Sequence, residues 1–369
     1  MKKKEAIHSW QMVIIFISFQ IGSAIMYVPG PLIGIAKNTS WLSVIIAGSL
    51  SFLILVVVLK LHQKYPQMSF IEMSRQLIGN KLTILLAIPY TITILFMLCL
   101  ILIDIKSFFT SSMMTQTPDY IFYSIILLNV VLTARAGIEV MARMFTFFLF
   151  IMYGSSILIM LLAFPFYQPE NLLPVLPDGL KPIIHGTYLL VFPFGEIVLL
   201  NMLLPFAKKS HRPKLHRRLY WTHVLNTFTL LIVVIVTIMV LGPMAERRAY
   251  SLFQIARLIE IGDFMERLES IIGISITFGT FTKATIVMFI LNLVLSELFK
   301  LNNQQVLSFP LALVVFLLSS TMFQYEAEQV KTVHDTWPFL VMVVGIFPTL
   351  LLGLIALFRK NTPSSSRKK

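Results

Sequence analysis

The chain has 369 residues, of which 57% are hydrophobic and only 13% charged, and its mean hydropathy is +0.83. A soluble domain carries about 25% charged residues. This composition therefore excludes a soluble enzyme, a disordered chain and a fibrous repeat protein. The net charge of +13 fits either a nucleic-acid-binding protein or a membrane protein, and the distribution of the basic residues separates the two.

Continuous apolar runs of about 20 residues predict transmembrane helices rather than the ~10-residue alternating strands of a barrel. In chain order, we expect ten spans, of which the fourth is short: 9–34, 41–61, 82–104, 119–134, 144–165, 183–206, 219–243, 270–298, 306–324 and 336–358. The connecting segments are too short for a separate soluble domain. We therefore expect a single transmembrane domain over residues 1–369, made of a first repeat at about 9–165, a second at about 183–358 and a cytoplasmic tail at 359–369.

Lysine and arginine are unevenly distributed between the predicted loops. With the N-terminus inside, the inner segments hold 21 of these residues, the outer segments hold 8, and one lies within a span. Because basic residues concentrate on the cytoplasmic side, we expect both termini and the 207–218 loop in the cytoplasm, and 166–182 and 244–270 outside. The basic charge is then a topology signal, which argues against a nucleic-acid partner. The 211–218 cluster is expected to attract anionic lipid headgroups or to dock a cytoplasmic protein.

Ten spans divide into two sets of five, and an odd number per set inverts the second set relative to the first. Span one then corresponds to span six, and both contain helix-breaking residues: Gln20-Ile-Gly-Ser-Ala24 with Pro29-Gly30-Pro31, and Phe192-Pro-Phe-Gly-Glu196. Proline removes an amide donor, and glycine permits non-helical backbone. Paired interrupted helices at corresponding positions of two repeats indicate a transporter-type binding site.

We therefore expect non-helical backbone at 22–24 and 192–195, facing each other across a cavity. The alternatives are ordinary proline kinks and a small-residue packing face at Gly30 and Gly34. The lysine-rich start followed by an apolar run is similar to a signal peptide. Its counterpart in span six leads us to expect that it is kept.

Two charged residues lie inside predicted spans. Glu196 directly follows the second break, and Lys283 is about 13 residues into span eight, roughly 20 Å deep at 1.5 Å per residue. Intramembrane charges are rare and usually functional. Lys283 shares helical spacing with Gly273, Thr277 and Thr280, which suggests a small, polar face. Three interpretations stay open: a structural Glu–Lys pair, a ligand or proton site, and a lysine that extends to the membrane surface.

Other reactive residue types give no site in the sequence. The single cysteine, Cys99, lies in an apolar run, and Asp104 and Glu297 lie at predicted span ends, so we read both acids as interfacial. Six histidines are expected at headgroup level. Four of them flank the inner loops, namely His62, His211, His216 and His223, and two flank the outer loops, namely His185 and His334. Phosphate-binding loops, nucleophile elbows and HExxH motifs are absent from the sequence. We therefore expect no catalytic residues, no metal ligands and no cofactor.

Several motifs resemble the B subunit of Bacillus-type spore germinant receptors. The most specific is the lead-in Asn171-Leu-Leu-Pro-Val-Leu-Pro-Asp-Gly-Leu-Lys-Pro-Ile-Ile-His-Gly186 before Phe192-Pro-Phe-Gly-Glu196. Others follow in the same order along most of the chain: Gln20-Ile-Gly-Ser-Ala24, Ala134-Arg-Ala-Gly-Ile-Glu-Val-Met-Ala-Arg143 and Ile261-Gly-Asp-Phe-Met-Glu-Arg-Leu-Glu269.

The resemblance implies a member of the amino acid–polyamine–organocation (APC) superfamily, an all-α membrane protein with two inverted five-helix repeats of the LeuT type. It implies a sensor in the spore inner membrane that works with an A subunit and a lipoprotein C subunit and binds a small nutrient such as an amino acid. The expected ligand site lies at the two breaks, with span eight beside them: Gly22, Ser23, Ala24, Phe194, Gly195, Glu196, Thr277, Thr280 and Lys283. The alternative is an H⁺- or Na⁺-coupled amino-acid transporter of the same superfamily.

Overall fold

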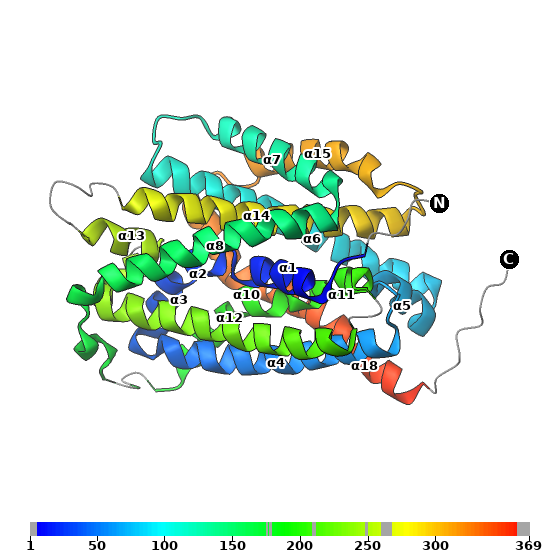
Figure 1. The fold of residues 1–369 in the computed structure, drawn as a ribbon, viewed down its shortest axis with the longest axis horizontal. Helices are drawn as coiled ribbons and strands as arrows, with labels where there is room; N and C mark the ends of the chain where they lie inside the picture. Colours follow the sequence, from blue (N-terminus) through cyan, green and yellow to red (C-terminus); the bar gives the residue numbers. More distant parts are fainter. Residues whose placement is uncertain are drawn as a thin grey trace.

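The first half of the chain forms five helical spans. The structure is a computed structural model that describes residues 6–174, 176, 179–208, 212–247, 250–259 and 268–359. Span one consists of three consecutive short helices, and the helices of this half are α1 (Ser9–Ile21), α2 (Ala24–Tyr27), α3 (Pro29–Ala36), α4 (Ser40–Lys64), the short α5 (Phe70–Ile78), α6 (Asn80–Ser112), α7 (Asp119–Ala136) and α8 (Ile138–Leu162). In Figure 1, α1 to α3 follow one another across the bundle and α4 runs back along its lower edge.

The second half repeats this plan with more irregular helices. Span six combines α9 (Lys181–Leu189), α10 (Val191–Gly195), the 3₁₀ turn η4 (Glu196–Leu199), α11 (Leu200–Leu203) and η5 (Leu204–Phe206). Span seven is α12 (Arg212–Leu241), followed by η7 (Gly242–Arg247) and α13 (Ser251–Leu258); span eight is α14 (Glu269–Leu298) and span nine is α15 (Ser308–Thr321). Span ten contains two π-helical stretches, in the order α16 (Glu326–Lys331), η10 (Thr332–Thr336), α17 (Trp337–Leu340), η11 (Val341–Ile346) and α18 (Phe347–Phe358).

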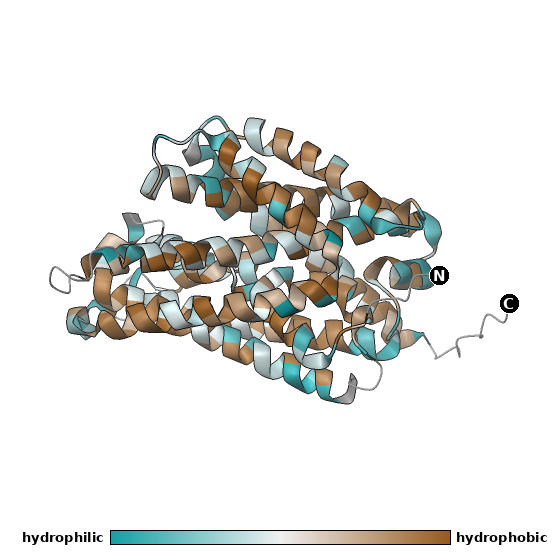
Figure 2. Cartoon of the chain, turned by 45° about the horizontal axis from the view of Figure 1, so that its top comes forward, coloured by the Kyte–Doolittle hydropathy of each residue, from teal (hydrophilic) through white to brown (hydrophobic). Residues whose placement is uncertain are grey.

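These helices confirm the predicted fold class. Among the described residues, nine segments are long and apolar enough to cross a membrane, or ten if the bent pair within span six is one span. Figure 2 shows the hydrophobic residues along the helices and hydrophilic ones gathered towards their ends. Span one was predicted to end at residue 34, and its last helix, α3, ends at Ala36, where one 3₁₀ turn joins it to α4.

The two broken spans and α14 define the centre of the bundle. In the most apolar stretches of α14 and of residues 9–27, 83% and 78% of the residues are buried, against 17% to 44% in the other membrane-spanning helices among the described residues. α1 packs against α8, α12 and α14, whereas α7 and α15 pack on each other at the upper edge of Figure 1. Residues on α1, α2 and α14 are therefore surrounded by protein, while most other spans present a broad apolar face to their surroundings.

The first break lies at Gly22 and Ser23, between α1 and α2, whereas Ala24, which was predicted to be non-helical as well, is the first residue of α2. The backbone of Gly22 lies directly on α14: a Cβ atom on Gly279 would approach the Gly22 carbonyl oxygen to 1.8 Å. Only glycine on both helices permits this contact. The expected packing role of Gly34 is also visible, because a Cβ there would lie 3.2 Å from the Glu246 Cγ atom.

The second break is displaced from its predicted position. Residues 191–195 form α10, so the expected non-helical stretch at 192–195 was wrong; the chain instead bends by 42° at Leu190 and changes to a 3₁₀ turn at Glu196. The physical reason is that a proline ring clashes with the carbonyl four residues before it and cannot bond to it. For Pro193 that residue is Leu189, the last residue of α9.

The start of span one and the end of span six are also joined. Ile7 and Ala207 form an isolated parallel bridge, in which the Ile7 amide donates to the Phe206 carbonyl (2.9 Å) and the Lys208 amide donates to the Ile7 carbonyl (3.0 Å). In Figure 1, α1 begins and α18 ends at the same end of the bundle, on the right. α4 begins at the opposite end.

Candidate functional site

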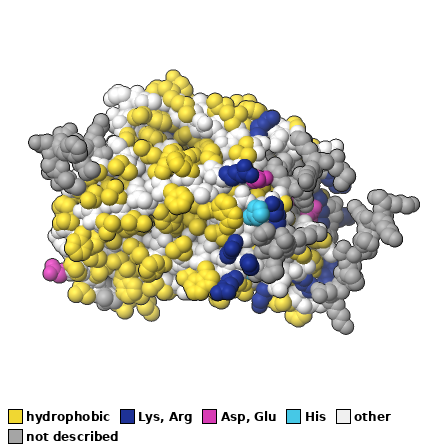
Figure 3. All heavy atoms as spheres, in the orientation of Figure 1, with side chains coloured by type: hydrophobic (Ala, Val, Ile, Leu, Met, Phe, Trp, Pro, Cys, Tyr) yellow, Lys and Arg dark blue, Asp and Glu magenta, His cyan; other side chains and the backbone are white. Residues whose placement is uncertain are grey.

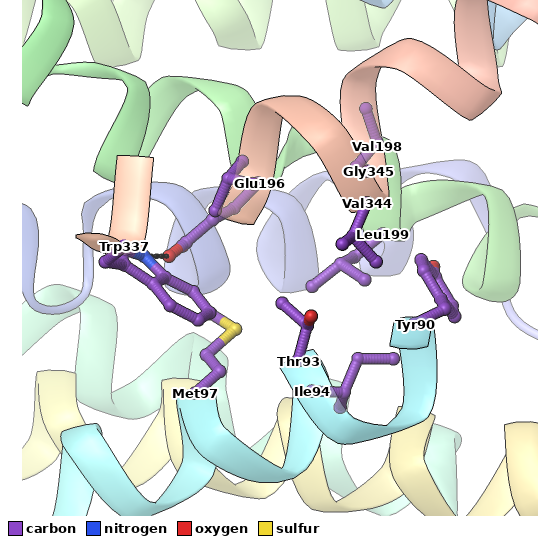
Figure 4. A pocket seen from close by; sticks show the side chains of 11 residues that line it. Tyr90, Thr93, Ile94, Met97, Glu196, Val198, Leu199, Trp337, Val344 and Gly345 are labelled. Carbon is purple, nitrogen blue, oxygen red and sulfur yellow. Dashed lines mark hydrogen bonds between the residues drawn. The ribbon is translucent and has the colours of Figure 1, made fainter. Parts of the chain in front are cut away.

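A buried ion pair joins span six to span eight at the second break. The Lys283 Nζ atom lies 2.8 Å from Oε2 of Glu196, and the two side chains are 0% and 1% exposed. The indole Nε1–H of Trp337 donates to the other oxygen of Glu196 at 3.0 Å, which Figure 4 shows from close by. Both predicted intramembrane charges therefore meet, and Lys283 does not extend to the surface.

Lys283 also contacts the first break. Its ammonium group donates to the Ser23 hydroxyl at 3.3 Å. The Phe192 and Phe19 ring centroids lie 4.6 Å and 5.9 Å from its Nζ atom, and an aromatic face attracts a cation within about 6 Å. One side chain of α14 thus touches α1, the first break, α10 and the carboxylate beyond the second break.

The local backbone explains why these groups meet. The bend at Leu190 and the 3₁₀ turn at Glu196 direct that carboxylate inward, and the Gly22–Gly279 contact brings α14 against the first break. Lys283 follows Gly279 by one helical turn, so the close contact fixes the position of its side chain. A buried charge without a partner costs several kcal/mol, and a pair is tolerated only with good geometry.

The remaining predicted residues divide into two groups. Ala24 and Thr280 are each 1% exposed and lie near the pair on α2 and α14. Phe194 instead faces α12 and α4, with its ring 5.8 Å from that of His223 and its carbonyl accepting from Ser51 at 2.8 Å. Gly195 packs against span ten, where a Cβ would lie 2.9 Å from Val341.

Thr277, the last predicted residue, is half-buried and its hydroxyl donates to the Gly273 carbonyl at 2.8 Å. The structure thus brings Gly22, Ser23, Glu196 and Lys283 together, through contacts that cross from one break to the other.

A cavity of about 400 Å³ opens next to the pair, on the side of Phe192. Phe192 belongs to its wall and also covers Lys283. Two carboxylates, Asp104 and Glu246, face it, and no lysine or arginine is among the described residues that line it: Tyr27, Val28, Pro31, Asp104, Ser107, Ser111, Leu189, Phe192, Glu246, Tyr250, Gln329, Val330, Val333 and His334. This outer cavity, at the end of the bundle opposite the start of α1, is therefore suited to a solute with a positive group.

Asp104 does not lie at the end of its helix, where it was predicted. α6 continues for two further turns beyond it, to Ser112, and the Asp104 Oδ1 atom accepts from the Gln329 amide at 2.8 Å. Deeper in the same region, the buried hydroxyls of Tyr27 and Thr280 lie close enough to pair with each other. Tyr27 also lines the cavity, so a polar ligand there would meet this pair of hydroxyls.

On the other side of Glu196 there is space for about one water molecule. This pocket of about 20 Å³ is apolar and lies between α6, η4 and span ten. Figure 4 shows Glu196 and Trp337 at one end of it, with Tyr90, Thr93 and Ile94 along α6. Because one water needs roughly this volume, the pocket cannot hold a solute as large as an amino acid, and the outer cavity is the larger space beside the pair.

A second buried polar group lies on the opposite side of span one. Asn226 donates to the Gln20 side-chain oxygen (2.8 Å), the Gln20 amide donates to His223 Nδ1 (3.1 Å), and His223 Nε2 donates to the Gly48 carbonyl (3.0 Å). These hydrogen bonds hold His223 inside the bundle, where it is 1% exposed, so its predicted position at headgroup level was wrong. The reason is that α12 begins at Arg212, two turns before its predicted start.

Sequence reasoning missed Trp337, Phe192 and Tyr27 as site residues. Aromatic side chains in apolar spans look alike whether they face lipid or a cavity; the one available signal was the Trp337-Pro338 pair in the middle of span ten. Cys99 is buried, as expected. Within the described ranges, no three His, Cys, Asp or Glu side chains form a group that could hold a metal ion. Most of the 261–269 motif, His211 and the tail beyond residue 359 lie outside the described residues.

Comparisons with known proteins agree with this architecture. The sequence matches the family described as "Spore germination protein" over residues 6–354. Spore germination protein KB of Bacillus subtilis (strain 168) is 24% identical over 99% of this chain and 98% of its own length. Spore germination protein YndE of the same organism is 26% identical over 95% of this chain and 96% of its own.

Solved structures show the same fold at low identity. A manganese transporter of Eremococcus coleocola, in complex with an aromatic bis-isothiourea compound, has a TM-score of 0.65 and 12% identity over 93% of this chain and 78% of its own. A mutant of that transporter has a TM-score of 0.64 and 12% identity, over 96% and 81%. At this identity the likeness shows the fold alone, the inverted-repeat architecture of LeuT- and APC-like transporters.

Proposed function

Because the chain belongs to the spore germination protein family, we propose that it is the membrane subunit of a germinant receptor and binds a free amino acid beside the Glu196–Lys283 pair. The observation that carries this proposal is the position of the pair. It joins both broken spans directly behind a cavity of about 400 Å³, which is within the ~300–1,000 Å³ of small-molecule sites.

The charges of the pair match those of an amino acid. In the free protein, Glu196 and Lys283 neutralise each other. An incoming ammonium group would bind the carboxylate of Glu196, and the ligand carboxylate would bind the ammonium group of Lys283. Each buried charge then exchanges one partner for another, so the ligand does not leave either charge uncompensated. Ser23, Tyr27 and Thr280 supply hydroxyls at the same place.

Phe192 controls the passage in this proposal. Its ring separates the outer cavity from Lys283, so it has to rotate before a ligand reaches the pair. Asp104 and Glu246 give the cavity a negative lining that attracts the ammonium end first. Separation of Lys283 from Glu196 would then release α14 and the first break from the second break. Partner subunits would read this conformational change.

Ligand binding tests the proposal directly. The full chain in lipid nanodiscs is mixed with each of the common amino acids, and the melting temperature reports binding. We expect at least one amino acid to stabilise the protein, and its amine-only and carboxylate-only analogues to fail. Glu196→Gln should weaken binding about tenfold to a hundredfold, the effect of losing one charged hydrogen bond of ~1.5–3 kcal/mol, at a normal protein level.

Glu246→Gln is the matched control, because it neutralises a carboxylate in the same cavity that lies away from the pair. It should change the affinity much less than Glu196→Gln. Equal effects of the two variants would show that only the general charge of the cavity matters. Stabilisation by no amino acid would contradict the proposed ligand class.

Germination tests the receptor role separately. Spores that lack this gene should fail to respond to the same amino acid, and the Glu196→Gln gene should restore the response only at higher concentrations. We propose an A subunit and a lipoprotein C subunit as partners, which co-purification of the full chain from spores would identify. We also propose that the protein lies in the spore inner membrane, with both termini cytoplasmic.

An H⁺- or Na⁺-coupled amino-acid transporter is the second candidate, favoured by the transporter-like fold. The two functions differ in one measurable property. A transporter accumulates labelled amino acid inside proteoliposomes when a proton or sodium gradient is applied, whereas a receptor binds it without net uptake. Gradient-dependent uptake by the chain alone would favour the transporter.

A further inference from the structure

A wide groove lies between the inner ends of α1 and α12, far from the outer cavity. It encloses about 640 Å³ and is lined by residues of these two helices: Trp10, Val13, Lys214, Arg217, Arg218, Trp221 and Thr222. The proposed nutrient site uses none of them. Figure 3 shows lysine and arginine side chains gathered at this end of the molecule, beside a broad hydrophobic surface.

Every charged residue among the described lining of the groove is basic. Lys214, Arg217 and Arg218 project from α12 within four residues of one another, and all three are exposed. Arg218 is held in place, because one of its guanidinium nitrogens donates to the Ser9 hydroxyl at 2.6 Å. None of the seven lining residues is acidic. A group of positive charges with no acidic residue among the described lining of the groove favours an anion, and guanidinium suits phosphate oxygens in particular.

The apolar part of the groove continues along α12. Trp10 and Trp221 are 46% and 66% exposed, and tryptophan concentrates where a membrane meets water. Below Trp221, at helical spacing, α12 exposes a row of large apolar side chains: Val224, Leu225 and Phe228. The row starts at the groove and runs towards the middle of the span. It offers a surface for a hydrocarbon chain that begins at the basic cluster.

We propose that this groove is a binding site for an anionic phospholipid, with the phosphate on Lys214, Arg217 and Arg218 and an acyl chain along Trp221, Val224, Leu225 and Phe228. Free phosphate would use the basic residues but not the apolar row. A bound lipid would touch both α1 and α12, so it would fasten the inner half of span one to span seven.

Native mass spectrometry of the purified full chain tests the site. We expect phosphatidylglycerol to bind more tightly than phosphatidylcholine, which carries the same chains and a phosphate but no net charge. Lys214→Gln/Arg217→Gln should weaken phosphatidylglycerol binding about thirtyfold, the weight of two basic residues near an anionic surface. This variant keeps the Arg218–Ser9 bond. The control Lys81→Gln/Lys300→Gln removes two exposed basic residues elsewhere and should leave binding within about twofold.

Two further measurements decide between occupants. Phe228→Ser should weaken phosphatidylglycerol binding without changing the charge, and glycerol phosphate in excess should not displace the lipid. Displacement by glycerol phosphate, or equal binding of the two lipids, would overturn the phospholipid assignment. If Lys214→Gln/Arg217→Gln left lipid binding intact and instead released a co-purified protein subunit, the groove would be a protein-docking surface and the proposal would be wrong.

Discussion

The buried pair allows a quantitative test of what holds the centre of the bundle together. Lys283→Met removes the 2.8 Å ion pair, the bond to Ser23 and the contact with two aromatic rings. It leaves the Glu196 carboxylate buried with the Trp337 indole as its remaining partner. Glu196→Gln keeps a side chain of the same size that can still accept from Trp337, and it leaves the ammonium group with Ser23 and the rings.

The expected costs differ between the two changes. An uncompensated buried charge destabilises by about 3–5 kcal/mol, a large part of a typical stability of ~5–15 kcal/mol, so Lys283→Met should lower the protein level strongly. Glu196→Gln should cost less than about 2 kcal/mol, because cation–π contacts of ~0.5–2 kcal/mol retain part of the stabilisation of Lys283. The double variant removes both charges and should be nearly as stable as the parent, which gives a coupling energy of about 3 kcal/mol or more.

Equilibrium unfolding of the four purified proteins in mixed micelles measures this coupling. The surface pair Glu139–Arg143 on α8 is the control, since both of its side chains are exposed and pairs of this kind couple by only ~0.3–0.5 kcal/mol. Strictly additive costs in the Glu196/Lys283 cycle would refute the reasoning. Germination separates stability from function: the double variant should fold normally and yet not respond, whereas a restored response would leave the pair with a structural role alone.

Three other variants test neighbouring features. Gly279→Ala should destabilise the protein by more than the ~1–3 kcal/mol that overpacking usually costs, because the added Cβ would lie 1.8 Å from a backbone oxygen. The control Gly154→Ala adds a Cβ in open space and should leave the melting temperature nearly unchanged. Trp337→Phe should cost about 1.5–3 kcal/mol by removing the donor to the buried carboxylate, and an unchanged melting temperature would show that this bond is dispensable. An impermeant maleimide should label Gln168→Cys in intact cells and Asn302→Cys only after permeabilisation; both positions are exposed, and the reverse pattern would invert the proposed orientation.

The sequence predicted those features that depend on local composition. Apolar runs predicted the spans, and two charges within them identified Glu196 and Lys283. The first break followed from Gly22. These signals are strong because hydrocarbon tolerates few charges and few unpaired backbone groups. The partnership of the two charges was one of three open interpretations, since nothing in the sequence fixes how α14 rotates against span six.

The errors share a physical cause. Hydropathy windows end where polar residues begin, yet α6 and α12 continue two turns beyond their predicted ends. Asp104 and His223 were therefore placed at headgroups, although each is hydrogen-bonded to another span. Trp337 and Phe192 were missed because their role depends on packing between distant spans. Residues near the end of an apolar window can be assigned only when the neighbouring helices are known.

The bridge between Ile7 and Ala207 has a mechanical consequence. It ties the broken spans at their inner ends, and Lys283 ties them again at the breaks. Between these two ties, the 13 residues of α1 form a rod of about 20 Å at 1.5 Å per residue. Because α1 and span six are connected at both ends, neither segment can tilt without the other. If the Glu196–Lys283 contact separates, the bridge remains as the pivot, so a displacement of a few ångströms at the breaks becomes a rotation of α1 about its N-terminal end.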